Sequence, residues 1–396
     1  MVDGVCTLED MARLDPGPGP KGASPFGAAY RGKRVLVTGH TGFKGSWLVF
    51  WLRKLGAEVT GYALPPETTP ALFEVLGLER ECQSQVGDIR DIDTLSSVLA
   101  RCEPDFVFHL AAQPIVRRSH AEPLETFDVN VRGTTTVLEA LRRSKRPCAV
   151  VVVSSDKCYE NREWVHGYRE SDALGGHDPY SASKAAAEVV TASYRRSFFP
   201  PHALDEHGIA LASARAGNVI GGGDWSVDRI LPDAVVALHA GRPIGVRNPR
   251  AVRPWQHVLE PLAGYLTLGA RLSSGSHAER ASFCDAWNFG PLPLSNRTVA
   301  DLADRVVASW GEGRWVDASK GGAPHESTFL ALSIDKALAS LSWRPRWSFE
   351  RAVVETVRWY RAYYGEGRSG AAQACTLEQI QAYTELEPSH TAEDSK

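Results

Sequence analysis

The stretch RVLVTGHTGFKG, residues 34–45, decides the fold of this chain. Its first five residues form a β-branched apolar run typical of a buried strand, and a helical pattern follows over Ser46–Leu55. Between them, Gly39, Gly42 and Gly45 allow a tight turn and a close approach of the backbone to a pyrophosphate. The N–H groups that open the helix then face that anion. The sequence therefore predicts a strand–turn–helix unit that holds the phosphates of a dinucleotide.

Apolar strands and helical stretches alternate beyond this unit. Helices are expected over Val129–Arg142 and Tyr180–Arg196. Further strands are expected at Glu58–Tyr62, Gln85–Val86, Phe106–Leu110, Ala149–Val153 and Ala210–Ala214. Strands without polar alternation indicate a parallel sheet covered on both faces. We therefore expect an α/β fold, a Rossmann-like doubly wound parallel sheet with a smaller mixed α/β substrate-binding lobe.

Composition shifts divide the chain into segments. Residues 15–25 are rich in Pro and Gly and cannot hold a helix or a ladder strand, so residues 1–30 are predicted to form a flexible extension. The nucleotide-binding domain is expected over 31–217, with 255–285 returning to it. The substrate-binding lobe is expected over 218–254 and 286–385, followed by a polar tail at 386–396.

Composition also excludes several classes of partner. The 396 residues carry a net charge of -3 without a basic block, which argues against nucleic-acid binding. The seven cysteines are scattered and never spaced C-x-x-C, which favours a reducing compartment. Charges interrupt every apolar run before about 18 residues, so no membrane span is expected. The histidines show no metal-ligand spacing. We expect a cytoplasmic protein without a metal.

Two motifs carry the predicted chemistry. Tyr180 and Lys184 lie four residues apart on a predicted helix and therefore share one face. A tyrosine is a poor base at neutral pH, and a neighbouring ammonium together with a positively charged nicotinamide would favour its phenolate. The second motif, Ser155-Asp156-Lys157, directly follows the buried strand at 149–153.

These motifs resemble the extended short-chain dehydrogenase/reductase family, in its nucleotide-sugar 4,6-dehydratase branch. The glycine spacing G-x-x-G-x-x-G and the Y-x-x-x-K pair match, and Asp156-Lys157 stands where this branch carries an acid–base pair, usually Asp-Glu. Asp-Lys followed by Cys-Tyr-Glu-Asn is similar to the enzymes that act on CDP-glucose. The segments RAGNVIGGGDW (215–225), RPWQHV (253–258) and WNFGP (287–291) extend the resemblance over about Gly32 to Tyr363.

The resemblance implies roles for individual residues. Ser155, Asp156, Lys157, Tyr180 and Lys184 would be catalytic. The cofactor would contact Tyr180, Lys184 and the glycine turn (Gly39, Thr41, Gly42, Phe43, Lys44, Gly45), Asp88 and Ile89 near the adenine, and Ala111, Ala112 and Gln113 near the ribose and pyrophosphate. Asn218 would position the sugar or phosphate. Arg253 is expected to bind the substrate pyrophosphate, because a guanidinium makes bidentate phosphate contacts.

The implied reaction begins when Tyr180 removes the C4 hydroxyl proton while NAD accepts the C4 hydride. Lys157 then takes the C5 hydrogen, Asp156 protonates the leaving C6 hydroxyl, and the hydride returns to C6. NAD is favoured by the resemblance. The second strand ends Thr60-Gly61-Tyr62-Ala63, without an acid for the ribose hydroxyl or an Arg for a 2′-phosphate. Lys44 in the glycine turn leaves NADP open.

Other functions remain open. A 4-epimerase or decarboxylase shares the Ser/Tyr/Lys triad but does not need Asp156-Lys157, and a dehydratase could act on another nucleotide glucose. A non-catalytic NAD-sensing protein should have lost Tyr180 or Lys184. Trp225, Trp255 and Trp287 are candidates either for stacking on the ligand or for core packing. A homodimer or homotetramer is expected, formed through the helices at 129–142 and 180–196.

Overall fold

The computed structural model describes residues 26–319, 329–365 and 367–385. The predicted extension as far as residue 25 and the predicted tail at 386–396 lie outside these residues. No helix in the described ranges is long and apolar enough to cross a membrane.

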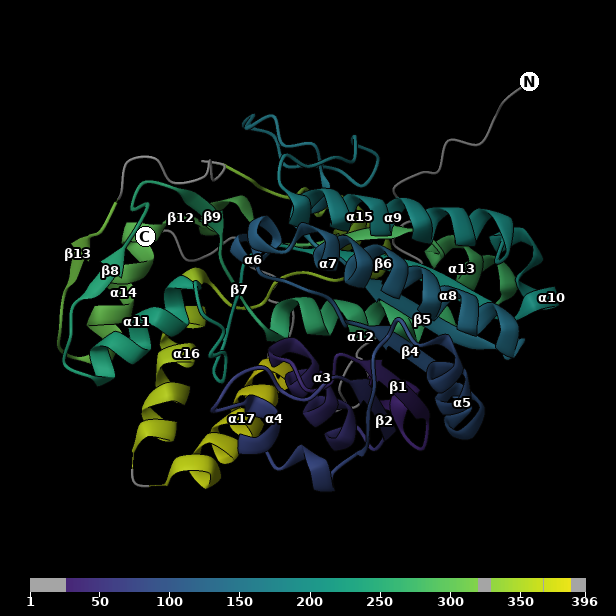
Figure 1. Ribbon diagram of the computed structural model, residues 1–396, viewed down its shortest axis with the longest axis horizontal. Helices are drawn as coiled ribbons and strands as arrows, with labels where there is room; N and C mark the ends of the chain where they lie inside the picture. The colour runs from purple at the N-terminus through teal and green to yellow at the C-terminus, as the bar shows by residue number, and fades with distance from the viewer. Residues whose placement is uncertain (1–25, 320–328, 366, 386–396) are drawn as a thin grey trace, which may run out of the picture.

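Seven parallel strands form one central sheet in the order β11-β6-β5-β4-β1-β2-β3 (Figure 1). The strands are β1 (Arg34–Thr38), β2 (Glu58–Ala63), β3 (Gln83–Val86), β4 (Phe106–His109), β5 (Cys148–Val153), β6 (Ile209–Ala216) and β11 (Ala286–Phe289). The order runs outward in both directions from the adjacent pair β1 and β4. In open α/β sheets, ligands bind beyond the carboxyl ends of strands at such a switch point.

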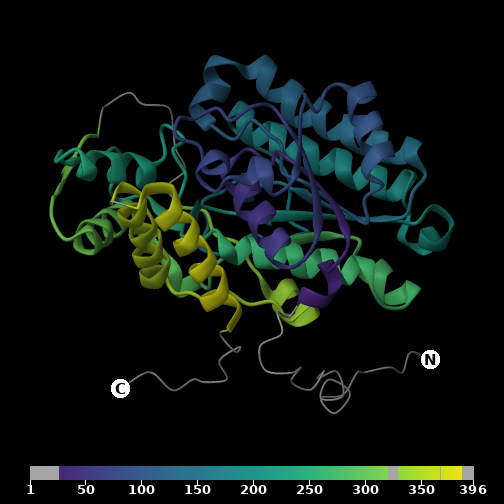
Figure 2. The ribbon, with the colours of Figure 1, turned by 90° about the horizontal axis from the view of Figure 1, so that it is seen from below.

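Helices cover both faces of the sheet, which gives three layers (Figures 1 and 2). Alternate residues of β1 enter separate cores: Leu36 packs on one side, and Val35 and Val37 pack on the other. The Leu36 side is covered by α5 (Ile92–Cys102), α8 (Gly133–Ser144) and α9 (Pro179–Ser197), and the opposite side by α3 (Phe43–Lys54) and α12 (Leu259–Ser273). The predicted doubly wound parallel sheet is confirmed.

The second lobe combines helices with short strands of both orientations. β8 (Ile244–Val246) pairs in parallel with β13 (Trp315–Asp317), whereas β9 (Val252–Pro254) pairs antiparallel with β12 (Asn296–Thr298). The lobe helices are α11 (Ile230–His239), α14 (Val299–Trp310), α16 (Phe349–Tyr364) and α17 (Arg368–Glu385). The remaining elements are α2 (Gly27–Tyr30), α4 (Leu72–Val75), α6 (Val116–Ala121), α7 (Pro123–Phe127), α10 (Leu204–His207), α13 (His277–Phe283), α15 (Asp335–Leu341), β7 (Val219–Ile220), β10 (Gln256–His257), the π-helical turn η2 (Asp128–Arg132) and the 3-10 turns η1 (Leu78–Arg80), η3 (Asp156–Cys158), η4 (Pro201–Ala203) and η5 (Pro293–Ser295).

Two predicted boundaries differ from the structure. The extension was expected to reach residue 30, but Phe26 and Tyr30 are buried, and the Tyr30 hydroxyl donates to the carbonyl of Leu266 at 2.6 Å. Aromatic burial therefore anchors α2 to the core. Residues 286–289 were expected in the lobe, but as β11 they pair with β6 in the central sheet. The buried segment Ala-Trp-Asn-Phe completes that edge of the sheet.

Candidate active site

A cavity of about 560 Å³ opens beyond the carboxyl ends of the strands. It lies where the connections that follow β1 and β4 run in opposite directions. Every residue predicted to act in catalysis or binding lines it: Gly39, Thr41, Gly42, Phe43, Lys44, Gly45, Asp88, Ile89, Ala111, Ala112, Gln113, Ser155, Asp156, Lys157, Tyr180, Lys184, Asn218 and Arg253. Segments far apart in the sequence therefore form one site.

The glycine turn between β1 and α3 leaves room for an anion. Gly39 has a φ of +75°, and a Cβ there would lie 2.6 Å from the backbone nitrogen of Ala111. A Cβ on Gly45 would overlap the carbonyl oxygen of Gly39. Gly42 is the N-cap of α3 and places no side chain over the first N–H groups of that helix. This bare helix start fits a pyrophosphate.

A neighbouring part of the cavity wall is formed by the turns after β3 and β4. Asp88 and Ile89 follow β3, and Ala111 to Gln113 follow β4. The backbone N–H of Gln113 donates to Oδ1 of Asn130 at 2.8 Å, which fixes this second turn against η2. These two turns fit the adenosine half of a dinucleotide.

Helix α9 presents Tyr180 and Lys184 to the cavity. Asp178 caps the helix by accepting from the backbone N–H of Ser181 at 2.9 Å, and Pro179 occupies its first turn. The backbone N–H of Tyr180 also donates to the Ser119 hydroxyl at 3.1 Å. These two hydrogen bonds hold the first turn of α9 in place.

Burial shifts both groups away from their charged forms. It raises the pKa of Tyr180 to about 12 and lowers the pKa of Lys184 to about 8. The groups that oppose the shift of the tyrosine pKa are chiefly the Ser155 hydroxyl and Arg229. Arg229 thus supplies an effect that the sequence suggested for Lys184. It lines the cavity and was not predicted, because a single arginine ahead of α11 carries no recognisable motif.

Ser155, Asp156 and Lys157 lie at the end of β5, in the turn η3. The Ser155 hydroxyl donates to Oδ1 of Asp156 at 3.0 Å and accepts from the backbone N–H of Lys157 at 3.3 Å. Burial raises the pKa of Asp156. Within the described residues, Oδ2 of Asp156 is buried without a hydrogen-bond partner. One oxygen of this carboxyl group is therefore not engaged by the described residues.

A buried ion pair lies beneath this turn and was not predicted. Glu188, one helical turn after Lys184, accepts from Arg215 and from the Ser213 hydroxyl at 2.8 Å each, and also from the Ser154 hydroxyl. Arg215 donates onward to the Tyr159 hydroxyl at 2.8 Å. Glu188 therefore joins α9 to the ends of β5 and β6. Residues so distant in the chain leave no local pattern.

The substrate end of the cavity lies between the sheet and the lobe. Asn218 and Arg253 reach it from the segment after β6 and from β9, and Trp225 and Trp255 also line it. Trp287 is buried in the hydrophobic core instead. Among the described residues, no group of three or more His, Cys, Asp or Glu side chains is arranged to hold a metal ion.

An exposed ionic bridge lies on the rim of the cavity. Oδ1 of Asp228 accepts from Arg117 of α6 at 3.2 Å and from Arg247, just after β8, at 2.6 Å. All three residues line the cavity, and Asp228 has a left-handed φ of +65°. The bridge connects the sheet side of the cavity to the lobe side.

The geometry agrees with comparisons to known proteins. The sequence profile of the GDP-mannose 4,6 dehydratase family matches residues 36–356. The chain belongs to this family. A CDP-glucose 4,6-dehydratase of Salmonella typhimurium is 47% identical over 334 residues, covering 84% of this chain and 92% of the relative. A dTDP-glucose 4,6-dehydratase of Streptomyces antibioticus is 30% identical, covering 83% and 92%. The predicted resemblance to nucleotide-sugar dehydratases is confirmed.

Solved structures of similar proteins share the fold of this chain. A double mutant of dTDP-glucose 4,6-dehydratase from Streptomyces venezuelae, with NAD bound, gives a TM-score of 0.68 at 26% identity, covering 83% of this chain and 97% of that one. UDP-glucose 4-epimerase from Thermotoga maritima also gives 0.68, at 21% identity, covering 83% and 98%. The epimerase likeness concerns the fold alone.

Proposed function

We propose that this protein is an NAD-dependent 4,6-dehydratase that converts CDP-D-glucose to CDP-4-keto-6-deoxy-D-glucose. The observation that carries the proposal is the placement of Asp156 and Lys157 in the same cavity as Ser155, Tyr180 and Lys184. An oxidation at C4 alone needs only the last three. The additional acid–base pair suits the removal of water across C5 and C6.

Each side chain has a defined task in this proposal. Tyr180 takes the proton of the C4 hydroxyl, and Ser155 turns its hydroxyl proton from Asp156 toward the same oxygen. The glycine turn would hold NAD, which would supply a hydride acceptor for C4 and a hydride donor for C6. Lys157 removes the C5 proton that the C4 ketone has made acidic, and it returns a proton to C5 when the hydride adds to C6. Asp156 protonates the departing C6 hydroxyl, which requires a carboxyl group that is neutral near pH 7.

The state of Asp156 supports its role as the acid. Burial raises its pKa, and its Oδ2 atom has no partner among the described residues. A proton on that oxygen is free to be donated to a substrate hydroxyl. Arg253 and Asn218 would hold the substrate's pyrophosphate and sugar from the lobe side, because a guanidinium suits phosphate oxygens.

NAD fits the glycine turn and the bare start of α3. The 26% identical dehydratase structure from Streptomyces venezuelae contains NAD, which supports the same cofactor here. The CDP carrier is favoured by the 47% identical relative from Salmonella typhimurium. We assign cofactor binding to residues 31–217 and 255–289 and substrate binding to 218–254 and 290–385.

Two further inferences concern the assembled protein. Exposed apolar side chains occur on and beside α9, including Val189 (57% exposed), Phe198 (46%) and, on α7, Leu124 (83%). We infer that α8 and α9 pack against a second copy, which light scattering would reveal as a dimer or tetramer. The six described cysteines are unpaired, which favours a reducing compartment such as the cytoplasm.

The test offers CDP-, dTDP-, UDP- and GDP-glucose and a nucleotide-linked uronic acid, each with NAD, and follows each by mass spectrometry. We expect CDP-glucose to lose one water, and a Tyr180→Phe protein to give no product. A C4 epimer would favour the epimerase alternative, and released carbon dioxide from a uronic acid substrate would favour a decarboxylase. Turnover of another nucleotide glucose without turnover of CDP-glucose overturns the choice of carrier.

A further inference from the structure

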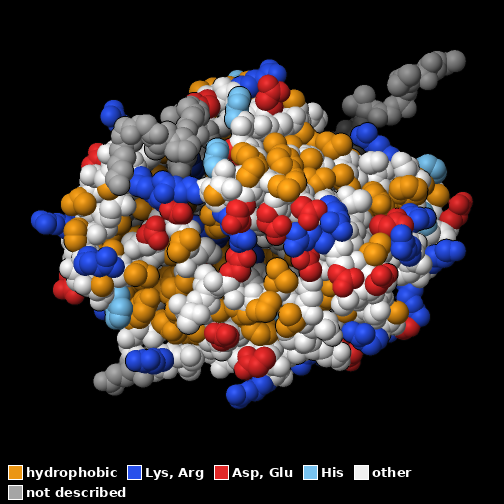
Figure 3. Space-filling model, viewed as in Figure 1, with side chains coloured by type: hydrophobic (Ala, Val, Ile, Leu, Met, Phe, Trp, Pro, Cys, Tyr) orange, Lys and Arg blue, Asp and Glu red, His pale blue; other side chains and the backbone are white. Residues whose placement is uncertain are grey.

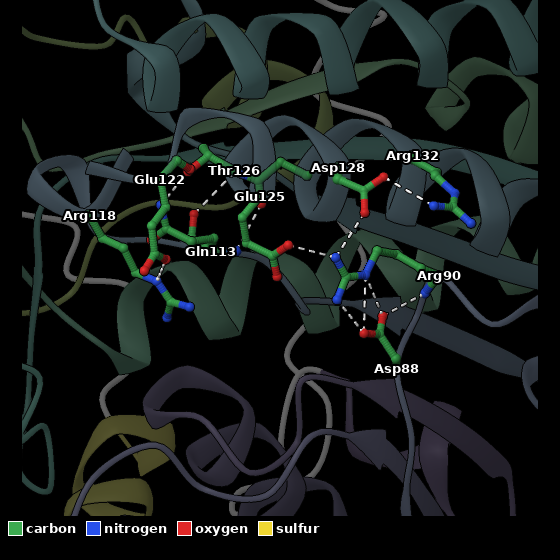
Figure 4. Close-up of polar contacts among 10 residues, drawn as sticks. Asp88, Arg90, Gln113, Arg118, Glu122, Glu125, Thr126, Asp128 and Arg132 are labelled. Atoms are coloured by element: carbon green, nitrogen blue, oxygen red, sulfur yellow. Dashed lines mark hydrogen bonds and ion pairs between the residues drawn. The ribbon is translucent and has the colours of Figure 1, made fainter. Parts of the chain in front are cut away.

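A cluster of charged side chains lies at the edge of the cavity, around the turn that follows β3 (Figure 4). At its centre, Arg90 contacts Asp88 of that turn, Glu125 of α7 and Asp128 of η2. Figure 3 shows acidic and basic side chains side by side on this part of the surface, over the region labelled α6 and α7 in Figure 1. We call Arg90, Asp88, Glu125 and Asp128 the Arg90 cluster.

Arg90 fixes the orientation of the Asp88 carboxylate completely. Its Nε and Nη2 atoms donate to Oδ2 at 3.1 and 2.6 Å, and Nε also donates to Oδ1 at 3.0 Å. The backbone N–H of Arg90 adds a bond to Oδ1 at 2.8 Å. Such a forked contact sets both distance and plane, which a lysine could not do.

The same guanidinium connects this turn to α7 and η2. Its Nη1 atom donates to Oε2 of Glu125 and to Oδ2 of Asp128, both at 2.8 Å. Asp88 and Glu125 line the cavity, whereas Arg90 is not among its lining residues in the described part of the chain. Arg90 therefore holds two cavity-facing carboxylates from behind, without needing to touch a ligand.

Without Arg90, these carboxylates would repel one another across a narrow gap. Only Arg132 would remain, and it is exposed and reaches Asp128 alone, at 3.2 Å. The hydrogen bonds from Arg90 also lower the pKa of Asp88 and of Asp128, so the cluster stays ionised. Loss of Arg90 would thus free the turn at Asp88 and Ile89, which forms the adenosine end of the cavity.

We propose that Arg90 is a positioning residue for cofactor binding, which holds Asp88 and Glu125 in the arrangement that receives the adenosine half of the dinucleotide. The proposal rests on the proposed use of NAD. It adds that affinity for the adenosine half depends on a residue outside the cavity, while the chemistry around Tyr180 at the other end does not.

The experiment measures the binding of ADP-ribose and NAD by calorimetry, and kcat and the KM for NAD in turnover, for Arg90→Gln. Arg132→Gln is the matched control, because it removes a neighbouring arginine from Asp128 and leaves the hydrogen bonds to Asp88 in place. We expect Arg90→Gln to weaken ADP-ribose binding and to raise the KM for NAD, each about tenfold, the lower end of the loss of a charge-assisted hydrogen bond. We expect kcat at saturating NAD within about twofold of wild type, and Arg132→Gln unchanged in every readout.

Arg90→Lys keeps the positive charge but cannot make the forked contact, and it replaces the glutamine variant if that variant fails to fold. We expect it to bind ADP-ribose about threefold more weakly than wild type. Unchanged ADP-ribose affinity in whichever variant folds overturns the proposal. A fall in kcat without a change in affinity, or an equal loss in Arg132→Gln, does so as well. If wild-type protein binds neither NAD nor ADP-ribose, both the proposed cofactor and the proposed role of Arg90 are wrong. If the Arg90 substitution weakens ADP-ribose binding as expected but no nucleotide sugar is dehydrated, only the proposed reaction is wrong.

Discussion

Replacement of Glu188 by glutamine tests the buried ion pair beneath the catalytic turn. Glu188 and the Arg215 side chain are only 2% and 4% exposed, and the carboxylate accepts hydrogen bonds from Arg215, Ser213 and Ser154. Glutamine keeps the shape but leaves the guanidinium of Arg215 as an uncompensated buried charge. Removal of one partner of a buried pair destabilises a protein by about 3–5 kcal/mol.

The assay is urea unfolding of four proteins, followed by the fluorescence of the 11 tryptophans. The proteins are wild type, Glu188→Gln, Arg215→Met and the double variant. We expect each single variant to lose about 3–5 kcal/mol in the free energy of unfolding. The double variant should lose at least about 1 kcal/mol less than the sum, because neither charge is then left alone.

A matched control is Glu122→Gln, which removes an exposed pair with Arg118 and should change the unfolding free energy by less than about 1 kcal/mol. The reasoning is refuted if Glu188→Gln is no more destabilising than this control. It is also refuted if the two buried substitutions are simply additive. Because the Ser154 hydroxyl binds Glu188 and Ser155 follows directly, kcat should fall in Glu188→Gln as well.

Three further predictions follow from the site and the core. Tyr180→Phe should lower kcat by about 10²–10⁴-fold while NAD still binds, as measured by turnover and calorimetry; full turnover would remove Tyr180 from the mechanism. Asp156→Asn should still oxidise C4 but eliminate water slowly, so that NADH absorbance accumulates during a single turnover; a normal elimination rate would contradict its role as the acid. Burial raises the pKa of Glu260 to about 7. The folded state therefore holds a proton that the unfolded chain loses above about pH 4.3, and stability should fall by up to about 3 kcal/mol as pH rises from 4.5 to 7. Glu260→Gln should flatten that decline in urea unfolding, and an unchanged slope would show that Glu260 is not its source.

The sequence was most informative where function requires a local pattern. The glycine turn, the Y-x-x-x-K spacing and the buried run before Ser155 each lie within one strand–loop–helix unit. Because parallel strands end at the same edge, these units bring their residues together, and all the predicted site residues line one cavity.

The features that sequence reasoning missed depend on contacts between distant segments. Nothing near Glu188 in the sequence indicates that it pairs with Arg215 from β6. The four-residue strand β11 is too short to show a period, and only its pairing with β6 identifies it. Arg229 approaches Tyr180 closely enough to affect its pKa only because the lobe folds back over the sheet. These contacts are set by tertiary packing rather than by local propensity.

The ionic bridge of Arg117, Asp228 and Arg247 has a consequence for ligand exchange. Its side chains are between 34% and 48% exposed, and exposed ion pairs contribute at most about 1 kcal/mol each. Two such pairs lower the population of an opened rim by a factor of about 30 at most. We therefore expect the bridge to favour a closed rim weakly, without trapping the product. Because exposed ion pairs weaken as salt is added, higher ionic strength should open the rim more often and speed product release.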